Sequence, residues 1–239
     1  MCVASQRERQ GTLAVIPARG GSRGVRGKNL ALVAGRPLIA YTIDVALRCQ
    51  NLTRVMTSTD DPAIAVVART MGCDVPYLRP AELAEDATPT VDVAIHALEW
   101  MEEQEGFRPR FLLVLQPTSP LRTQDDIVRA LAMLYEDAVD AVVGVAVPST
   151  HPQWAMTVSQ DGYLSRYLPQ GSTPTRRQDL APIYAPNGAV FAISREALLA
   201  ERTLYPRRTV AYVMPSERSL DIDSTWDLHI ADLLIRETR

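Results

Sequence analysis

The sequence has few cysteines, no long apolar run and no excess of basic charge. Its three cysteines, Cys2, Cys49 and Cys73, are widely separated and form no CxxC pair. This spacing disfavours both a disulfide framework and a zinc–thiolate site. Nowhere do about 18 apolar residues follow one another, and the first residues lack the apolar core of a secretory signal. We therefore expect a cytoplasmic protein that does not span a membrane.

The charges are nearly balanced, with 25 basic and 28 acidic residues and a formal net charge of −3. Such a balance provides no overall attraction to nucleic acid or to an anionic membrane. Hydrophobic residues make up 46% of the chain, which is typical of a soluble globular protein. A length of 239 residues fits one α/β domain with an inserted lobe, so we expect a single domain over residues 1–239.

Apolar runs of strand length alternate with helical patterns along the chain. Strands are expected at 13–18, 55–59, 75–78, 111–115, 140–147, 189–193 and 210–214. Helices are expected at 37–48, 62–71, 90–105, 124–135 and 225–236, with a short one after Ser194. This alternation predicts a three-layer α/β/α sandwich around a mostly parallel, Rossmann-like sheet. It stops between 148 and 186, a segment too long for an ordinary connection, which predicts a separate lobe.

The most informative stretch is IPARGGSRGVRGKN, residues 16–29, in which glycines and cations follow an apolar strand. Glycines allow the backbone to approach a ligand, so that amide groups converge on phosphate oxygens. The countercharge comes from four cations: Arg19, Arg23, Arg26 and Lys28. A Walker A loop would need glycine at Ser22 and a hydroxyl residue at Asn29, and no register gives the dinucleotide fingerprint. The stretch therefore predicts a polyphosphate site of another kind; an RNA-binding arginine–glycine segment and a solvated turn are the alternatives.

Asp221 and Asp223 flank Ile222 in the sequence DIDSTWD. In an extended backbone, residues i and i+2 project to the same side, so both carboxylates face one point. Hard oxygen ligands beside a polyphosphate suit Mg²⁺, which takes one or two protein carboxylates and keeps several waters. The alternative is that one of the two merely caps the following helix.

These motifs resemble the acylneuraminate cytidylyltransferase (CMP-sialic acid synthetase) family over about residues 12 to 232. The resemblance is carried by the glycine loop ending in KN, the helix opening PLI-Y, and the runs TSTDDPAIA, RPAELAED, LQPTSPLR, RRQDL, PNGAVF and DIDSTWD. It departs at Arg26, where the family usually has Pro, and mildly at Arg23, where it usually has Lys.

The resemblance implies an enzyme of the nucleotidyltransferase fold. Such an enzyme joins CTP to an acidic 2-keto sugar, such as a nonulosonic acid, and forms a CMP-sugar and pyrophosphate with Mg²⁺ as cofactor. The alternatives are the same transfer to an octulosonate or a non-sugar acid, and a non-catalytic nucleotide-sugar binding protein.

The resemblance also implies a role for each candidate site residue. CTP would be bound by Arg19, Gly20, Gly21, Ser22, Arg23, Lys28 and Asn29 at its phosphates and by Arg79 and Thr90 at its base. The acceptor would be bound by Gln116, Arg177, Gln178, Asn187 and Tyr205. Mg²⁺ would be held by Asp221 and Asp223, which act in catalysis with Lys28 and Arg19. From the residues alone, Arg79 could equally form a surface salt bridge, and Gln116 could satisfy its own turn.

The irregular segment, 148–186 and extending to about 208, resembles the lobe through which the family forms homodimers. The position of a phenylalanine pair in the family is taken here by Leu204 and Tyr205. The histidines have no mutual spacing suited to a metal and are given no role, and the tryptophans are expected in the core or an interface: His96, His151, His229, Trp100, Trp154 and Trp226. The expected partners are thus CTP, an acidic 2-keto sugar and a second copy of the chain.

Overall fold

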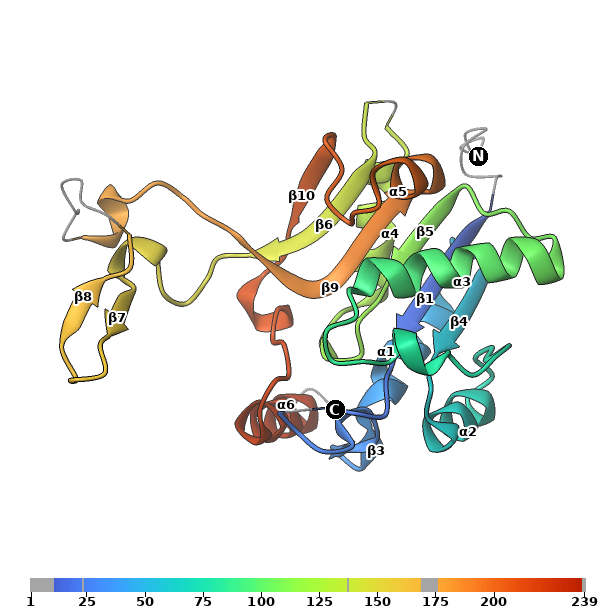
Figure 1. Ribbon diagram of the computed structural model, residues 1–239, viewed down its shortest axis with the longest axis horizontal. Helices are drawn as coiled ribbons and strands as arrows, with labels where there is room; N and C mark the ends of the chain where they lie inside the picture. Colours follow the sequence, from blue (N-terminus) through green and yellow to red (C-terminus); the bar gives the residue numbers. More distant parts are fainter. Residues whose placement is uncertain (1–10, 23, 137, 169–175, 238–239) are drawn as a thin grey trace.

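The computed structural model describes residues 11–22, 24–136, 138–168 and 176–237. Its main sheet has six strands in the order β10-β6-β9-β5-β1-β4 (Figure 1). These strands are β1 (Thr12–Pro17), β4 (Arg54–Ser58), β5 (Phe111–Val114), β6 (Ala141–Ala146), β9 (Ala185–Ser194) and β10 (Thr209–Val213). The helices are α1 (Leu38–Arg48), α2 (Pro62–Thr70), α3 (Thr90–Glu105), α4 (Gln124–Leu134), α5 (Arg195–Glu201) and α6 (Thr225–Glu237). Short strands β2 (Leu32–Val33) and β3 (Arg36–Pro37) pair beside the main sheet.

The predicted three-layer sandwich with a mostly parallel sheet is confirmed. Strand β1 runs parallel to β4 and β5, and β6 runs parallel to β10. Strand β9 is the exception, because it pairs antiparallel with both β5 and β6. It also begins earlier than predicted, at Ala185, so that Asn187 and Gly188 belong to the strand.

The core lies on both faces of this sheet. Along β1, Ala14 and Ile16 pack with α1, α2 and α4, while Leu13 and Val15 pack with α3. This division follows from the alternation of side chains along a strand, and it explains why β1 is apolar at every inward position. A third cluster joins α6 to β2 and the start of α1 around the fully buried Ile222. None of the described helices is long and apolar enough to cross a membrane.

The predicted helix starts are confirmed where a side chain caps them. Asp61 accepts from the Ala63 amide at 2.7 Å before α2, and Thr123 forms a capping box with Asp126 before α4. Two predictions were wrong. Pro37 precedes α1 as part of β3 rather than standing in the first turn of the helix. Residues 75–78 form no strand, because Pro76 has no amide hydrogen to donate to a strand ladder. Only isolated bridges occur there, at Leu78 and at the preceding Asp74.

The predicted lobe leaves the sheet between β6 and β9 and stands apart from the main body (Figure 1). It contains the hairpin of β7 (Met156–Val158) and β8 (Leu164–Arg166). Its large apolar side chains are exposed: Met156, Val158, Tyr163, Leu164, Tyr167 and Leu168. An assembly that covers these side chains remains a prediction.

Asp126, at the start of α4, anchors the segment that leads to Asp221. Its buried carboxylate accepts hydrogen bonds from Arg218 Nη2 at 2.8 Å and from the Tyr212 hydroxyl at 2.9 Å. Burial alone would raise the pKa of this carboxyl, but the hydrogen bonds from Arg218 and Thr123 outweigh burial and hold the pKa below its usual range. The carboxylate therefore stabilises the fold above the pKa that it has in the unfolded chain, and this contribution is lost as the pH falls through the lower, folded value.

Asp126→Ala is expected to lower the free energy of unfolding by roughly 2–4 kcal/mol at neutral pH, because it leaves partners of a buried carboxylate unpaired. Urea titrations of the variant and the wild type measure the difference. The matched control is Asp125→Ala, which removes a neighbouring carboxylate that is 59% exposed. If the two variants lost equal free energy of unfolding, the stabilising role assigned to the buried Asp126 carboxylate would be contradicted.

Candidate active site

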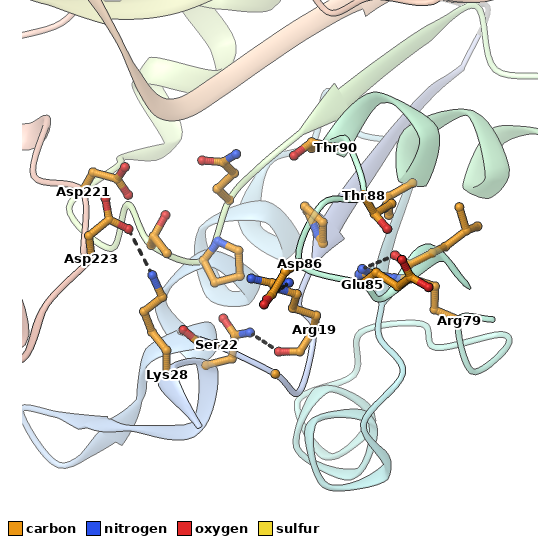
Figure 2. Close-up of a pocket in the computed structure, with 18 residues that line it drawn as sticks. Arg19, Ser22, Lys28, Arg79, Glu85, Asp86, Thr88, Thr90, Asp221 and Asp223 are labelled. Carbon is orange, nitrogen blue, oxygen red and sulfur yellow. Dashed lines mark hydrogen bonds and ion pairs between the residues drawn. The ribbon is translucent and has the colours of Figure 1, made fainter. Parts of the chain in front are cut away.

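A cavity of about 330 Å³ lies at the end of β1 where the glycine loop begins. It is bordered by that loop, the loop before α3, the loop after β5 and the segment before α6 (Figure 2). The structure brings most of the predicted site residues to this cavity: Arg19, Gly21, Ser22, Lys28, Asn29, Arg79, Thr90, Gln116, Asp221 and Asp223. Arg23 lies outside the described residues.

The glycine loop is held in a close fold by its neighbours. The Gly20 amide donates to Asp60 Oδ1 at 3.0 Å, and Asn29 Nδ2 donates to the Arg19 carbonyl at 2.9 Å. A side chain at Gly24 would place its Cβ 2.1 Å from the Asp223 carbonyl oxygen. Glycine is therefore required at this position because the loop and the Asp221–Asp223 segment touch through their backbones.

Lys28 joins the glycine loop to the Asp221–Asp223 segment. Its ammonium donates to the Ile222 carbonyl at 2.7 Å and lies 3.2 Å from Asp223 Oδ1. The Ile222 amide donates to the Thr118 carbonyl at 2.9 Å, and the Ile222 side chain is buried. The segment is thus fixed on both sides, with its two carboxylates turned toward the cavity (Figure 2).

The two carboxylates have the chemistry that a hard divalent cation needs. Burial raises the pKa of Asp221, the hydrogen bond from Thr118 lowers it, and the nearby charge of Asp223 raises it further. A cation between the two groups would relieve this repulsion. Among the described residues, no group of three or more His, Cys, Asp and Glu side chains could hold a metal. The pair therefore fits an ion that takes its other ligands from phosphate and water, as Mg²⁺ does.

The opposite wall of the cavity is formed by the loop before α3. Arg79 is buried and donates to both the carbonyl and the hydroxyl oxygen of Ser58 and to the Leu83 carbonyl. Burial lowers the pKa of its guanidinium. The alternative that Arg79 forms a surface salt bridge is therefore wrong, because this side chain lies inside the protein and fixes the loop before α3. On the same wall, Asp86 pairs with Arg19 at 2.6 Å between Oδ1 and Nη1.

The loop after β5 depends on a residue that the sequence did not single out. Arg122 is fully buried and donates to the Ala189 carbonyl, to Thr42 Oγ1 at 3.1 Å and to the Gln116 carbonyl at 2.6 Å. Burial lowers its pKa to about 9. Arg122 therefore positions the backbone of Gln116, whose side chain lies against Gly188. Arg122 ends the run LQPTSPLR and Asp86 ends the run RPAELAED. Nothing in either run distinguishes a buried arginine or a cavity-lining carboxylate from an exposed side chain.

Three other predicted acceptor residues, Asn187, Gln178 and Tyr205, do not line the cavity of their own chain. Asn187 is buried and donates to Ser219 Oγ at 3.0 Å. Gln178 lies in the lobe, beside His151, and Arg177 belongs to the 3-10 turn Arg177–Asp179 of the same lobe. Tyr205 is 52% exposed and contacts the edge of Phe191. Their predicted roles in acceptor binding remain untested within one chain.

This α/β sandwich, with a cation-bearing glycine loop facing two carboxylates, has the features of a nucleotide-binding protein. Residues 13–229 match the family model described as Cytidylyltransferase. The chain therefore belongs to the cytidylyltransferase family, and the resemblance seen in its sequence motifs is confirmed.

Curated relatives agree with this family. The N-acylneuraminate cytidylyltransferase of Streptococcus agalactiae is 34% identical over 94% of this chain, and the alignment covers 55% of that relative. The Escherichia coli protein of the same name is 34% identical over 92% of this chain, and the alignment covers 51% of that relative. The chain thus spans about half the length of these relatives. The CMP-N,N'-diacetyllegionaminic acid synthase of Legionella pneumophila is 34% identical over 93% of this chain and 95% of its own length.

Solved structures confirm the nucleotidyltransferase fold. CMP:2-keto-3-deoxy-manno-octonic acid synthetase complexed with CTP has a TM-score of 0.68 at 20% identity, covering 96% of this chain and 100% of the other. The 4-diphosphocytidyl-2C-methyl-D-erythritol synthase of Anaerococcus prevotii has a TM-score of 0.66 at 13% identity, covering 95% and 99%.

Proposed function

We propose that the chain is a CTP-dependent cytidylyltransferase that activates an acidic 2-keto sugar of the nonulosonic acid class and releases pyrophosphate. The observation that carries the proposal is the joint presence of Lys28, Asp221 and Asp223 around one cavity, in a chain similar over nearly its full length to the diacetyllegionaminic acid synthase. The similarity to the N-acylneuraminate enzymes supports the same acceptor class. A reaction that consumes CTP also supports the predicted cytoplasmic location.

In the proposed reaction, the anomeric hydroxyl oxygen of the sugar attacks the α-phosphorus of CTP. A bond from that oxygen to phosphorus forms, the bond from the α-phosphorus to the bridging oxygen breaks, pyrophosphate leaves, and the hydroxyl proton passes to solvent. Arg19 and Lys28 stabilise the phosphate oxygens as charge develops, and the amides of the glycine loop orient them. Lys28 is suited to this task because its side chain is only 14% exposed, so its charge is weakly screened.

Asp221 and Asp223 are the residues that would hold Mg²⁺. When bound, this ion would supply charge neutralisation at the phosphates. The chain itself contributes the fixed backbone of Ile222, which keeps the two carboxylates on the side that faces the cavity. We further propose that Arg79 and Thr90, which line the opposite wall, contact the nucleotide base.

The acceptor half of the proposed site requires a second chain. The lobe carries Arg177 and Gln178 away from its own cavity, and its exposed apolar side chains are the kind of surface that a dimer interface buries. In a two-fold dimer, the guanidinium of Arg177 would bind the acceptor carboxylate at the partner's cavity.

Tyr205→Ala is expected to raise the Michaelis constant for the acceptor acid roughly tenfold, because a half-exposed aromatic side chain at a sugar site contributes on the order of 1 kcal/mol or more. The dissociation constant for CTP should be unchanged. Steady-state kinetics and CTP titrations measure the two effects. Val213→Ala, which removes another exposed apolar side chain, is the control. A fully active monomer in sedimentation and dilution experiments would contradict the shared site.

A screen for pyrophosphate release tests the proposed function directly. Four nucleoside triphosphates are combined with a panel of 2-keto acids that contains nonulosonic acids, an octulosonate and a non-sugar acid. Release with CTP and a nonulosonic acid is the expected result. Release with only the octulosonate or the non-sugar acid would support the alternative acceptors, and binding of CMP-sugar without release would indicate a non-catalytic binding protein.

A further inference from the structure

The ion pair between Arg19 and Asp86 occupies the position where the proposed function places a phosphate. Arg19 follows β1, and Asp86 lies on the loop before α3, yet Nη1 and Oδ1 are 2.6 Å apart. Both side chains line the cavity and are about one-third exposed, at 31% and 37%. Figure 2 shows Asp86 above Arg19, inside the ring of residues that surrounds the cavity.

A carboxylate and a phosphate compete for the same guanidinium, because each presents anionic oxygens to the same donors. A polyphosphate bound to Arg19 would also lie within a few ångströms of the Asp86 charge and would be repelled by it. Lys28, another cation that lines the cavity, likewise contacts a carboxylate, that of Asp223. Asp223 has a proposed role in holding a metal, whereas Asp86 has none.

Asp86 stands on a turn outside the sheet. Its turn is closed by its own hydrogen bonds, from the Thr88 amide to the Glu85 carbonyl and from Thr88 Oγ1 to the Glu82 carbonyl. Before the turn, Arg79 fixes the Leu83 carbonyl, and after it α3 begins at Thr90. The ends of the turn are thus anchored, while Glu85, Asp86 and Ala87 between them are exposed.

We propose that Asp86 is an affinity-determining residue of the phosphate site, a competing carboxylate that holds Arg19 until a polyphosphate displaces it. This inference rests on the proposed function, since it assumes that Arg19 binds phosphate. Its consequence is weaker binding of both CTP and the product pyrophosphate than Arg19 alone would give. A site that holds pyrophosphate less tightly releases it sooner, which favours turnover when release limits the rate.

The experiment is calorimetric titration of the full chain with inorganic pyrophosphate, without acceptor. Asp86→Asn is expected to bind pyrophosphate roughly twofold to fivefold more tightly than the wild type, which is the range for loss of a partly exposed ion pair. Glu85→Gln removes a neighbouring charge that also borders the cavity, and it should produce a smaller gain. In an Arg19→Ala background, Asp86→Asn should produce a smaller gain than in the wild type, since the competition requires the guanidinium and only the direct repulsion between Asp86 and the phosphate charge is left.

The alternative is that Asp86 only orients Arg19 for the ligand. In that case, Asp86→Asn would bind pyrophosphate more weakly than the wild type or equally well, and either result overturns the proposal. An equal gain in the Arg19→Ala background would also overturn it, because the effect would then be a general one of charge. A wild-type protein that binds no pyrophosphate would contradict the phosphate site itself, whereas tight wild-type binding with a weaker Asp86→Asn variant contradicts only the competition.

Discussion

Asp221→Asn is expected to lower turnover roughly 100- to 1000-fold with little change in stability. The amide is nearly isosteric with the carboxylate and can keep the contact with Thr118, so the segment should stay in place. What is lost is the negative charge of the more buried of the two carboxylates that face the cavity. Asp223→Asn should be less damaging, because the Asp223 side chain is 80% exposed and can act through water.

Rates of pyrophosphate release at saturating CTP and Mg²⁺ measure this effect, and thermal unfolding checks the fold. Asp227→Asn is a matched control in the same segment. The Asp227 carboxylate accepts from the Ser224 amide at 2.7 Å and from the Asp223 amide at 3.1 Å, so it acts at the start of α6. Its loss should lower stability more than turnover. Near-normal activity of Asp221→Asn at saturating Mg²⁺ would contradict the assignment of Asp221 as a ligand of the metal ion.

Lys28→Ala is expected to reduce kcat roughly 100-fold or more and also to weaken CTP binding. The Lys28 side chain lines the cavity, and charge that develops on the phosphates during the proposed transfer strengthens its interaction with them in the transition state. The variant also removes the donor to the Ile222 carbonyl, which fixes the carboxylate segment. Both losses act on the chemical step.

Steady-state kinetics with CTP as the varied substrate separate the two effects. A change confined to the Michaelis constant would show that Lys28 binds the ground state and the transition state equally well, against our expectation. Arg26→Ala is the control, since this cation of the same loop is exposed. Its effect should be small and should diminish further at high salt, as expected of a side chain that only steers CTP.

Much of the fold could be predicted because local chemistry and tertiary structure agree. Asp61 and Thr123 cap helices through bonds to amides two or three residues away, and such contacts are visible in sequence spacing. The carboxylate segment is similar: a buried Ile222 between two cavity-facing aspartates follows from the two-residue period of extended backbone.

The rest could not be predicted because it depends on contacts between distant segments. The close approach of Gly24 to the Asp223 backbone joins residues about two hundred positions apart, and the motif alone shows only that glycine is present. The burial of Arg122 depends on β9, which carries the Ala189 carbonyl that it binds. The hydrogen bond from the Asn187 amide to Ser219 also joins distant segments, and the PNG run alone shows only that an amide is present. The role of Asn187 in acceptor binding stays a prediction.

Because β9 pairs antiparallel with β6, the two ends of the lobe lie side by side at the edge of the main body. The last residue of β6 and the first residue of β9 are paired, Ala146 with Ala185, so the chain leaves the sheet and returns to it at adjacent positions. An insertion whose two ends already lie side by side can be lengthened, shortened or exchanged without moving the strands that carry it. Under the proposed function, replacement of this one segment would change acceptor preference and assembly among related chains, while the nucleotide half of the cavity stays as it is.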